Sequence, residues 1–397
     1  MAQQILQNTP TYNIFMFIFS LGQFVGVLPL NFIENVKHST MKFRWTSYKT
    51  VYSFMHVILL MCMVIFCVAY AQSSKSGWTF RHIVRTLFYI SSLWGALSFF
   101  LITRKWPVLL DKWIGLDYMM ENHYGFPKNM SKRARITGIV SILYGLTQIL
   151  IFLVYNVQNT RRIASNNNVR FEHSVYFKNV FPQIFKFLPY SIFIGLIAQF
   201  TYIFSVWRMA YTDLLISFIS SFLSIRFQQV TNRINQSLNK NRTVAFWREV
   251  REDYDRICTL CKEVDEVITN VVFVSYAANL MLLLVYLRYC TIVEGLSWEK
   301  IYNAVCFVIY LIRIFVISLY VSWINDESKE PRSVLNSVST AQYNSEIQRF
   351  LQHISFNSVA FSGNKMFKVT RTLILNIGGI ILTYELVLVQ FSEFNFN

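Results

Sequence analysis

The last apolar run of the chain, residues 372–391, reads TLILNIGGIILTYELVLVQF. Twenty mostly apolar residues are the length that an α-helix needs to cross the core of a bilayer. Asn376, Thr383 and Gln390 recur every seven residues, with Gly379 between the first two, so all four share one helix face. Lipid cannot satisfy these polar groups. The face must therefore meet protein, as in a helix packed closely at Gly379, or water, as in the wall of a pore.

The composition indicates a membrane protein. The chain has 397 residues, of which 54% are hydrophobic and only 15% charged, and its mean hydropathy is +0.37. Soluble globular domains are about 25% charged. The net charge of +16 sits mostly at the edges of apolar runs, which favours a lipid bilayer and no nucleic acid as partner. No cleavable signal is evident near the start, so we expect the first span to act as a signal anchor.

Seven apolar stretches are long enough to cross a bilayer, so we predict an all-α polytopic membrane protein with seven transmembrane helices. They are Val51–Ala71, His82–Ile102, Thr137–Asn156, a fourth that starts near Phe187, Val267–Leu287, Ile301–Ile324 and the terminal stretch above. The earlier apolar run from Phe15 to Leu30 is broken by Gly and Pro, so it is expected to lie at the membrane interface.

The fourth stretch predicts an unusually long helix. Its apolar pattern continues through residues 211–227, where no Gly or Pro turns the chain, so we expect one helix that runs to Ile234. At 1.5 Å per residue it would measure roughly 70 Å, far more than a bilayer. Apolar residues at intervals of three and four between Phe246 and Ile268 also predict an amphipathic helix that leads into the fifth span. A similar helix is expected over Tyr343–Val359, so a helical collar should form beside the membrane.

The positions of the basic residues predict an inverted topology with the N-terminus inside and the C-terminus outside. With that orientation, 25 of the 37 Lys and Arg lie on inner segments. We expect residues 1–50 to form a cytosolic and interfacial segment, 51–324 a six-helix ligand-binding bundle with cytosolic extensions, 325–371 a collar helix and linker, and 372–397 the pore-lining helix with a short extracellular tail. The Asn-x-Ser/Thr sequons at Asn129, Asn235 and Asn241 would then carry no glycan.

Nothing in the sequence favours an enzyme, a metal site or a cofactor. No pair of histidines has His-x-x-x-His spacing, and no Gly-x-Ser-x-Gly or phosphate-binding glycine loop occurs. Cys258 and Cys261 have metal-ligand spacing but lack a second pair. A G-protein-coupled receptor shares the number of spans, but the third span lacks an Asp-Arg-Tyr and the seventh an Asn-Pro-x-x-Tyr. A transporter should show repeated halves or broken helices, and only weak breaks occur.

Several stretches resemble one family. Thr383-Tyr384 followed by Gln390-Phe391 resembles the C-terminal signature of insect gustatory receptors. Residues 23–29, 42–48, 246–251 and 359–371 are similar to its sugar-responsive members, although Asn364 and Lys368 depart from that pattern. The resemblance implies a ligand-gated, non-selective cation channel, a homotetramer or a heterotetramer with related receptors, in the plasma membrane of sensory neurons. Its tastant would be a sugar, and a different tastant or a seven-helix G-protein-coupled receptor stay as alternatives.

In the channel interpretation the last helix lines the pore. Copies of the helix around a common axis would form rings of polar groups, in which Gln390 replaces water around an ion. Phe391 would form an apolar constriction, and Glu393 would concentrate cations at the exit, unless it is only a solvated tail residue. The full set of predicted pore residues is Asn376, Thr383, Val387, Gln390, Phe391 and Glu393.

A sugar pocket requires aromatic rings and a few convergent hydrogen-bonding groups. The outer halves of the spans supply both kinds of residue. For any one of them, ordinary packing or the aromatic belts at membrane surfaces are a sufficient explanation, and only the enrichment taken together favours a pocket. The candidates are Tyr89, Ser92, Trp94, Gln148, Tyr155, Asn156, Tyr190, Trp298, Tyr302 and Asn303.

Overall fold

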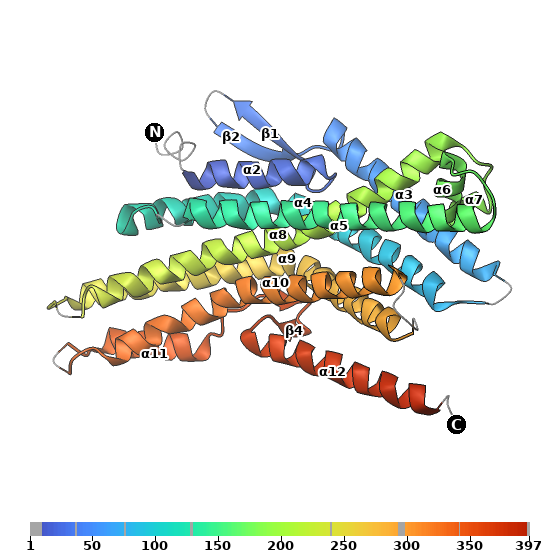
Figure 1. Cartoon of the computed structure of the whole chain (residues 1–397). Helices are drawn as coiled ribbons and strands as arrows, with labels where there is room; N and C mark the ends of the chain where they lie inside the picture. The colour runs from blue at the N-terminus through green and yellow to red at the C-terminus, as the bar shows by residue number, and fades with distance from the viewer. Residues whose placement is uncertain are drawn as a thin grey trace.

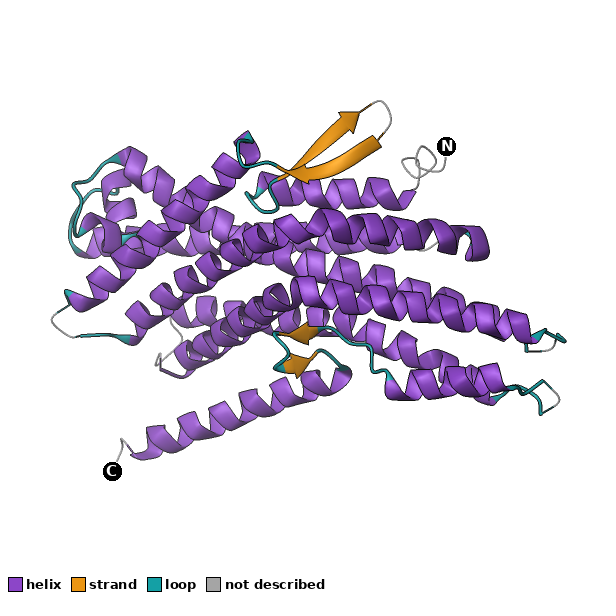
Figure 2. Ribbon diagram, turned by 180° about the vertical axis from the view of Figure 1, so that it is seen from behind, coloured by secondary structure: helices purple, strands orange, loops and turns teal. Residues whose placement is uncertain are grey.

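The protein is a long bundle of helices (Figure 1). A computed structural model describes residues 10–35, 38–74, 77–127, 130–238, 240–292, 298–340 and 342–394. Nearly all of them are helical, and the strands form two small hairpins (Figure 2). The elements are α2 (Pro10–Phe24), β1 (Leu30–Asn35), β2 (His38–Phe43), α3 (Tyr48–Gln72), α4 (Phe80–Tyr124), α5 (Met130–Asn166), α6 (His173–Val180), α7 (Pro182–Phe185), α8 (Ile192–Asn235), α9 (Val244–Ile292), α10 (Trp298–Asn336), α11 (Ser345–Phe356), β3 (Ser362–Gly363), β4 (Phe367–Lys368) and α12 (Arg371–Phe394).

Six helices of the described chain are long and apolar enough to cross a membrane: α3, α4, α5, α8, α9 and α10. The terminal helix α12 has 24 residues and is the seventh helix of transmembrane length. The longest, α9, has 49 residues, or roughly 74 Å at 1.5 Å per residue. A bilayer core is about 30 Å thick, so the long helices project well beyond it. The predicted polytopic all-α fold is confirmed.

Helix α8 confirms the prediction of a single long helix without a hairpin. It runs for 44 residues, and every side chain from Ala210 to Phe227 is buried. A helix covered on all sides needs no polar face, which is why this segment shows no amphipathic period. The helix was predicted to start near Phe187, and it begins five residues later, at Ile192, after an irregular segment that contains Pro189.

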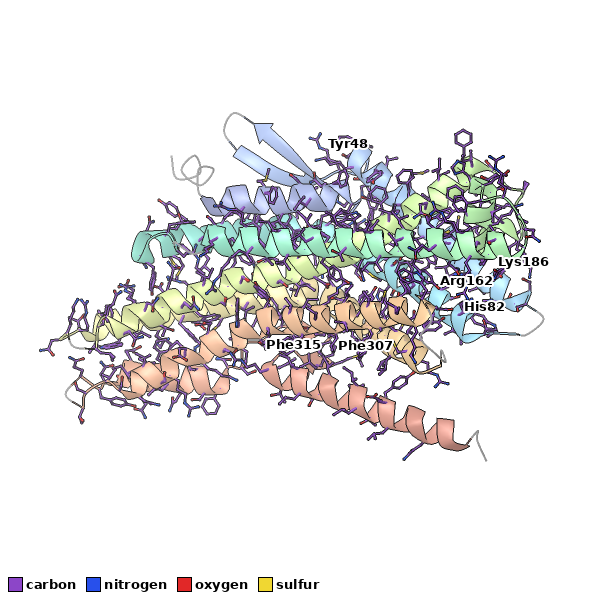
Figure 3. The ribbon with its side chains drawn as sticks, viewed as in Figure 1. Tyr48, His82, Arg162, Lys186, Phe307 and Phe315 are labelled. Atoms are coloured by element: carbon purple, nitrogen blue, oxygen red, sulfur yellow. The ribbon has the colours of Figure 1, made fainter. Side chains whose placement is uncertain are left out.

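The two ends of the bundle differ, and each is named here by the short helices that mark it. The α6–α7 end contains α6 and α7, near His82, Arg162 and Lys186 (Figure 3). The α11 end contains α11 and the tips of α4, α8 and α9 (Figure 1). The amphipathic helix predicted to lead into the fifth span is confirmed, because α9 is continuous from Val244 to Ile292. Helix α11 is shorter than predicted, beginning after the cap at Asn344 and ending at Phe356.

The sequence did not predict the short elements that precede the first span or connect later ones. Strands β1 and β2 form an antiparallel hairpin that pairs Leu30 with Phe43 and Asn35 with His38. This hairpin and α2 lie along one side of the bundle (Figure 1). The connection between α5 and α8 contains the short helices α6 and α7, which close the α6–α7 end of the bundle. Helix α2 occupies part of the apolar run that was expected at the interface.

A small hairpin anchors the start of α12. The carboxylate of Asp265 on α9 accepts hydrogen bonds from the backbone N–H and the hydroxyl of Ser362, at 2.6 and 2.7 Å. Arg371, the first residue of α12, pairs with Asp326 of α10 at 2.7 Å. From this anchor α12 runs beside the bundle and packs against α9 and α10 (Figure 1). The predicted division into segments 1–50, 51–324, 325–371 and 372–397 stays a prediction.

Candidate ligand and pore sites

A cavity of about 200 Å³ lies at the α6–α7 end, between five of the long helices. Tyrosine dominates its wall, with Tyr89 from α4, Tyr202 from α8, Tyr286 and Tyr289 from α9, and Tyr302 and Tyr310 from α10. Arg81, Arg85 and Asn156 add polar groups, and Phe181 and Gln183 close it from the α6–α7 connection. Aromatic surface with a few placed polar groups is the usual make-up of a small-molecule site.

Stacked rings hold this wall in place. Tyr155 stacks on Tyr302 with ring centres 3.9 Å apart, and Phe152 stacks on Tyr202 at 3.8 Å. Tyr286 stacks on Tyr310 at 5.4 Å. Each pair joins two helices, α5 to α10, α5 to α8 and α9 to α10. Rotation of one helix would therefore move a ring that faces the cavity.

Gln183 is the polar residue that the sequence did not single out. Its side chain is 1% exposed, and its amide oxygen accepts a hydrogen bond from Arg85 Nη1 at 3.0 Å. Its amide nitrogen has no partner among the described residues. A buried donor left unpaired costs about 1–3 kcal/mol, unless a ligand or water accepts from it. Gln183 lies in a short connection that has no periodic pattern, so no signal in the sequence would have identified it as a cavity residue.

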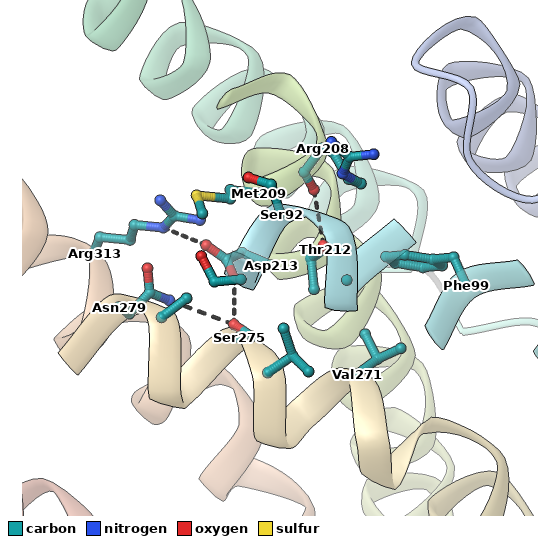
Figure 4. A pocket seen from close by; sticks show the side chains of 14 residues that line it. Ser92, Phe99, Arg208, Met209, Thr212, Asp213, Val271, Ser275, Asn279 and Arg313 are labelled. Carbon is teal, nitrogen blue, oxygen red and sulfur yellow. Dashed lines mark hydrogen bonds and ion pairs between the residues drawn. The ribbon is translucent and has the colours of Figure 1, made fainter. Parts of the chain in front are cut away.

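A buried ion pair lies beneath the cavity. Asp213 of α8 accepts from Arg313 of α10 and, at 2.6 Å, from the hydroxyl of Ser275 on α9 (Figure 4). The Arg313 Nη1 donates to the Tyr144 hydroxyl of α5 at 2.9 Å. Arg313 is also 5.9 Å from the ring of Tyr310 in the cavity wall. The cavity floor and this four-helix network are thus in direct contact.

Three of the ten predicted pocket residues line the cavity: Tyr89, Asn156 and Tyr302. Two more support it from behind, since Tyr155 stacks on Tyr302 and Gln148 lies within hydrogen-bonding reach of the Tyr310 hydroxyl. The others lie elsewhere. Ser92 lines a cavity of about 20 Å³ beside Asp213, Tyr190 contacts Phe185, Asn303 is buried in α10, and Trp94 and Trp298 are each 49% exposed. Trp94 follows Tyr89 by five positions, about 140° around α4, so both cannot face the cavity.

The predicted pore residues lie on an open face of α12. Asn376, Thr383 and Gln390 are all exposed, and Val387 is 39% exposed. The Thr383 hydroxyl donates to Gly379 O at 2.9 Å, which leaves its oxygen able to accept from water. No side chain of this chain therefore seals the stripe along the described part of α12. The side chains of Phe391 and Glu393 lie outside what the structure describes.

Apolar residues of α12 are open as well. Leu375, Leu382 and Leu386 are 76%, 63% and 66% exposed, whereas Ile377 is buried against the bundle. Isolated apolar residues at a surface need no explanation, but a whole helix of them indicates contact with lipid or with another chain. A polar stripe beside an apolar one cannot face lipid throughout, so the described part of the chain leaves the polar face of α12 without a protein partner.

The bundle, its tyrosine-lined cavity and its largely exposed final helix together indicate a multi-pass receptor of the membrane. The family model described as trehalose receptor matches residues 5–396, so the chain belongs to this family of gustatory receptors. The resemblance inferred from the sequence is thereby confirmed, and the chain is a receptor and not an enzyme.

Curated relatives extend over most of the chain. The gustatory receptor for sugar taste 64a of Drosophila melanogaster is 29% identical over 390 residues, which cover 96% of this chain and 84% of that protein. The gustatory receptor 5a for trehalose of the same species is 24% identical over 79% of this chain and 70% of that protein. Among solved structures, the insect olfactory receptor OR5 from Machilis hrabei superposes with a TM-score of 0.68 at 16% identity, covering 95% and 97% of the two chains. That likeness shows a shared fold.

Proposed function

We propose that the chain is a subunit of a sugar-gated, non-selective cation channel in the plasma membrane of sensory neurons. Four subunits, identical or from related gustatory receptors, would surround one pore lined by α12. The N-terminus would be cytosolic, so the α6–α7 end and its cavity would face outward. The α11 end would then form the predicted cytosolic collar.

The open polar stripe of α12 is the observation that carries this proposal. Asn376, Thr383 and Gln390 lie at the surface of the subunit on a helix of transmembrane length, where lipid would leave them unsatisfied. Copies arranged around an axis would turn the stripe toward water, while the exposed leucines would meet neighbouring subunits or lipid. Carboxamide and hydroxyl oxygens can replace part of the hydration shell of a cation.

The tyrosine-lined cavity supports a sugar as the ligand. A sugar ring has apolar faces edged by hydroxyl groups, so it suits aromatic rings combined with a few hydrogen-bonding groups. Tyr302 and Tyr202 supply ring surface, and the Gln183 amide N–H and the Asn156 carboxamide supply a donor and an acceptor. Two relatives described as receptors for sugar taste and for trehalose agree with this ligand class.

The test is a recording of currents across a panel of sugars. The protein is expressed in cells alone and together with a related receptor, with G-protein signalling blocked in a parallel set. We expect at least one sugar to evoke a cation current that persists under the block. A current abolished by the block would favour a G-protein-coupled receptor. Responses confined to tastants other than sugars would overturn the ligand class, and no current in either set would overturn the channel.

Variants separate the two sites. Tyr302→Ala should shift the sugar dose-response to higher concentration by about tenfold or more, because a wall ring and its stacked partner are lost. Trp94→Ala, on another face of α4, is the matched control. If Tyr302→Ala and Trp94→Ala changed the dose-response equally, Tyr302 would not belong to the ligand site.

Gln390→Ala should change ion selectivity or conductance with normal surface expression, whereas Leu382→Ala, about 80° around α12, should not. If Gln390→Ala and Leu382→Ala changed the current equally, Gln390 would not belong to the pore.

A further inference from the structure

Another cavity, of about 520 Å³, lies at the α11 end, far from the tyrosine-lined one. It lies where α4, α8 and α9 end, and its wall includes Gln229, Asn232, Arg233, Lys240, Arg242 and Phe246. No Asp or Glu is among the described residues that line it. The turn from α10 to α11 also reaches this region, since Gln342 Nε2 donates to Lys240 O at 3.2 Å.

The cavity carries positive charge that the described residues do not neutralise. Arg233 pairs with Glu249 at 2.9 Å and lies 3.7 Å from Asp253, so carboxylates behind the wall balance this residue. Lys240 and Arg242 take part in no ion pair within the described ranges, and both are exposed. His123 also lines the wall, with Glu249 and Asp253 at 3.6 and 3.3 Å. Within the described chain, the cavity therefore has unpaired positive charge at its rim, from Lys240 and Arg242, and a region deeper in its wall where the charge of Arg233 is neutralised.

Aromatic rings hold the two arginines in position. The guanidinium groups of Arg233 and Arg242 lie 5.2 and 4.8 Å from the centre of the Phe246 ring, and Arg233 lies 4.8 Å from that of Tyr124. A stacked guanidinium loses less conformational freedom when it binds an anion. Because the rings already carry arginines, they offer little free surface for a flat base. The amides of Asn232 and Gln236 add neutral hydrogen-bonding groups.

We propose that this cavity binds a soluble small molecule that carries several phosphate groups. The planar guanidinium matches two phosphate oxygens at once, and several cations together match a clustered negative charge. Helix α8 is roughly 66 Å long, and the cavity lies at its far tip, so the headgroup of a membrane lipid is out of reach. The cytosolic location rests on the orientation proposed above, but binding itself does not.

Binding to the purified full-length protein tests this site. Inositol hexakisphosphate and ATP are titrated separately by calorimetry at about 0.15 M salt, where weak surface attraction is screened. Inorganic phosphate is the reference anion. The test variant is Lys240→Gln with Arg242→Gln, and the control is Lys105→Gln with Arg332→Gln, which removes two exposed cations elsewhere.

We expect one polyphosphate to bind more tightly than inorganic phosphate and to lose at least about tenfold in affinity in the test variant, since charged hydrogen bonds disappear. The control should stay within about twofold, and the tighter probe identifies the source of the phosphates. The proposal is overturned if neither probe binds, if binding is no tighter than for inorganic phosphate, or if both double variants weaken it equally. No current is measured, so failure of the sugar-gated channel would leave this result standing.

Discussion

The buried pair of Asp213 and Arg313 connects four helices near the tyrosine-lined cavity, because Asp213 also accepts from Ser275 and Arg313 also donates to Tyr144. The side chain of Asp213 is 9% exposed and that of Arg313 is 4% exposed. Burial of both charges is costly, so an ion pair of this kind need not stabilise the fold more than an apolar pair would. It does enforce one arrangement of α5, α8, α9 and α10, because any other leaves a charge unpaired.

Asp213→Asn should therefore destabilise the protein strongly. An uncompensated Arg313 would stay buried, and breaking such a pair costs about 3–5 kcal/mol. Ser275→Ala removes one hydrogen bond to the same carboxylate and should cost only about 1 kcal/mol. Thermal unfolding of the purified variants measures both. If the two substitutions lower the melting temperature equally, the charge on Asp213 does not organise the helices.

Glu346 is a second buried carboxylate, at the α11 end. It accepts hydrogen bonds from Arg251 Nε and Arg349 Nη1, both at 3.0 Å, and its residue is 3% exposed. The hydrogen bond from Arg251 lowers the pKa of the Glu346 carboxyl, and the charges of Arg251, Arg349 and Arg248 act in the same direction, although desolvation opposes them. A lowered pKa in the folded state means that the ionised group stabilises the fold.

The stabilisation by Glu346 should depend on pH in a defined direction. It is fully present above the ordinary carboxyl pKa of 4.5 and is lost as the pH falls through the lower value of the folded state. Glu346→Gln should therefore lower the melting temperature at pH 7, and the gap to wild type should narrow below pH 4.5. A gap that is constant over this range would show that shape, not charge, accounts for the effect.

At the scale of elements, periodicity predicted the long helices well. The unbroken apolar pattern of residues 211–227 predicted the continuity of α8, and the amphipathic pattern between Phe246 and Ile268 predicted the first part of α9. Sequence failed at β1–β2, α6 and α7, which are short and depend on packing against the bundle for their stability. Helix α7 has only four residues and α6 eight, about two turns or fewer, so neither shows a clear helical period.

The candidate sites were predictable only in part, for a geometric reason. The outer halves of the spans could be recognised as rich in aromatic and polar residues, yet which of them converge depends on the rotation of each helix. Tyr89 and Tyr302 turned toward the cavity, while Trp94 turned away and Gln183 arrived from a connecting segment. The stripe of α12 needed no such knowledge, since its period lies within one helix.

For the whole molecule, the orientation in the membrane makes a prediction about glycosylation. With the N-terminus inside, the native sequons at Asn235 and Asn241 lie at the cytosolic α11 end and should stay unmodified. Val169→Thr creates a new sequon at Asn167, in the turn that follows α5 at the α6–α7 end. This variant should gain one glycan, seen as a mobility shift that a glycosidase removes.

The native protein is the control in that experiment, and it should show no shift. A glycan on Asn235 or Asn241 would place the α11 end outside and reverse the proposed topology. The polyphosphate site would then face the extracellular side, although its affinity in solution would be unchanged.

The loose attachment of α12 also bears on how different receptors combine. In the proposed channel, neighbouring subunits would cover the exposed surface of α12, so each subunit would contribute one helix to the common passage and keep its own ligand cavity. Mixed assemblies would then respond to a wider range of compounds with little change in the passage for ions. New taste specificities could arise by substitutions in the cavity of one subunit at a time.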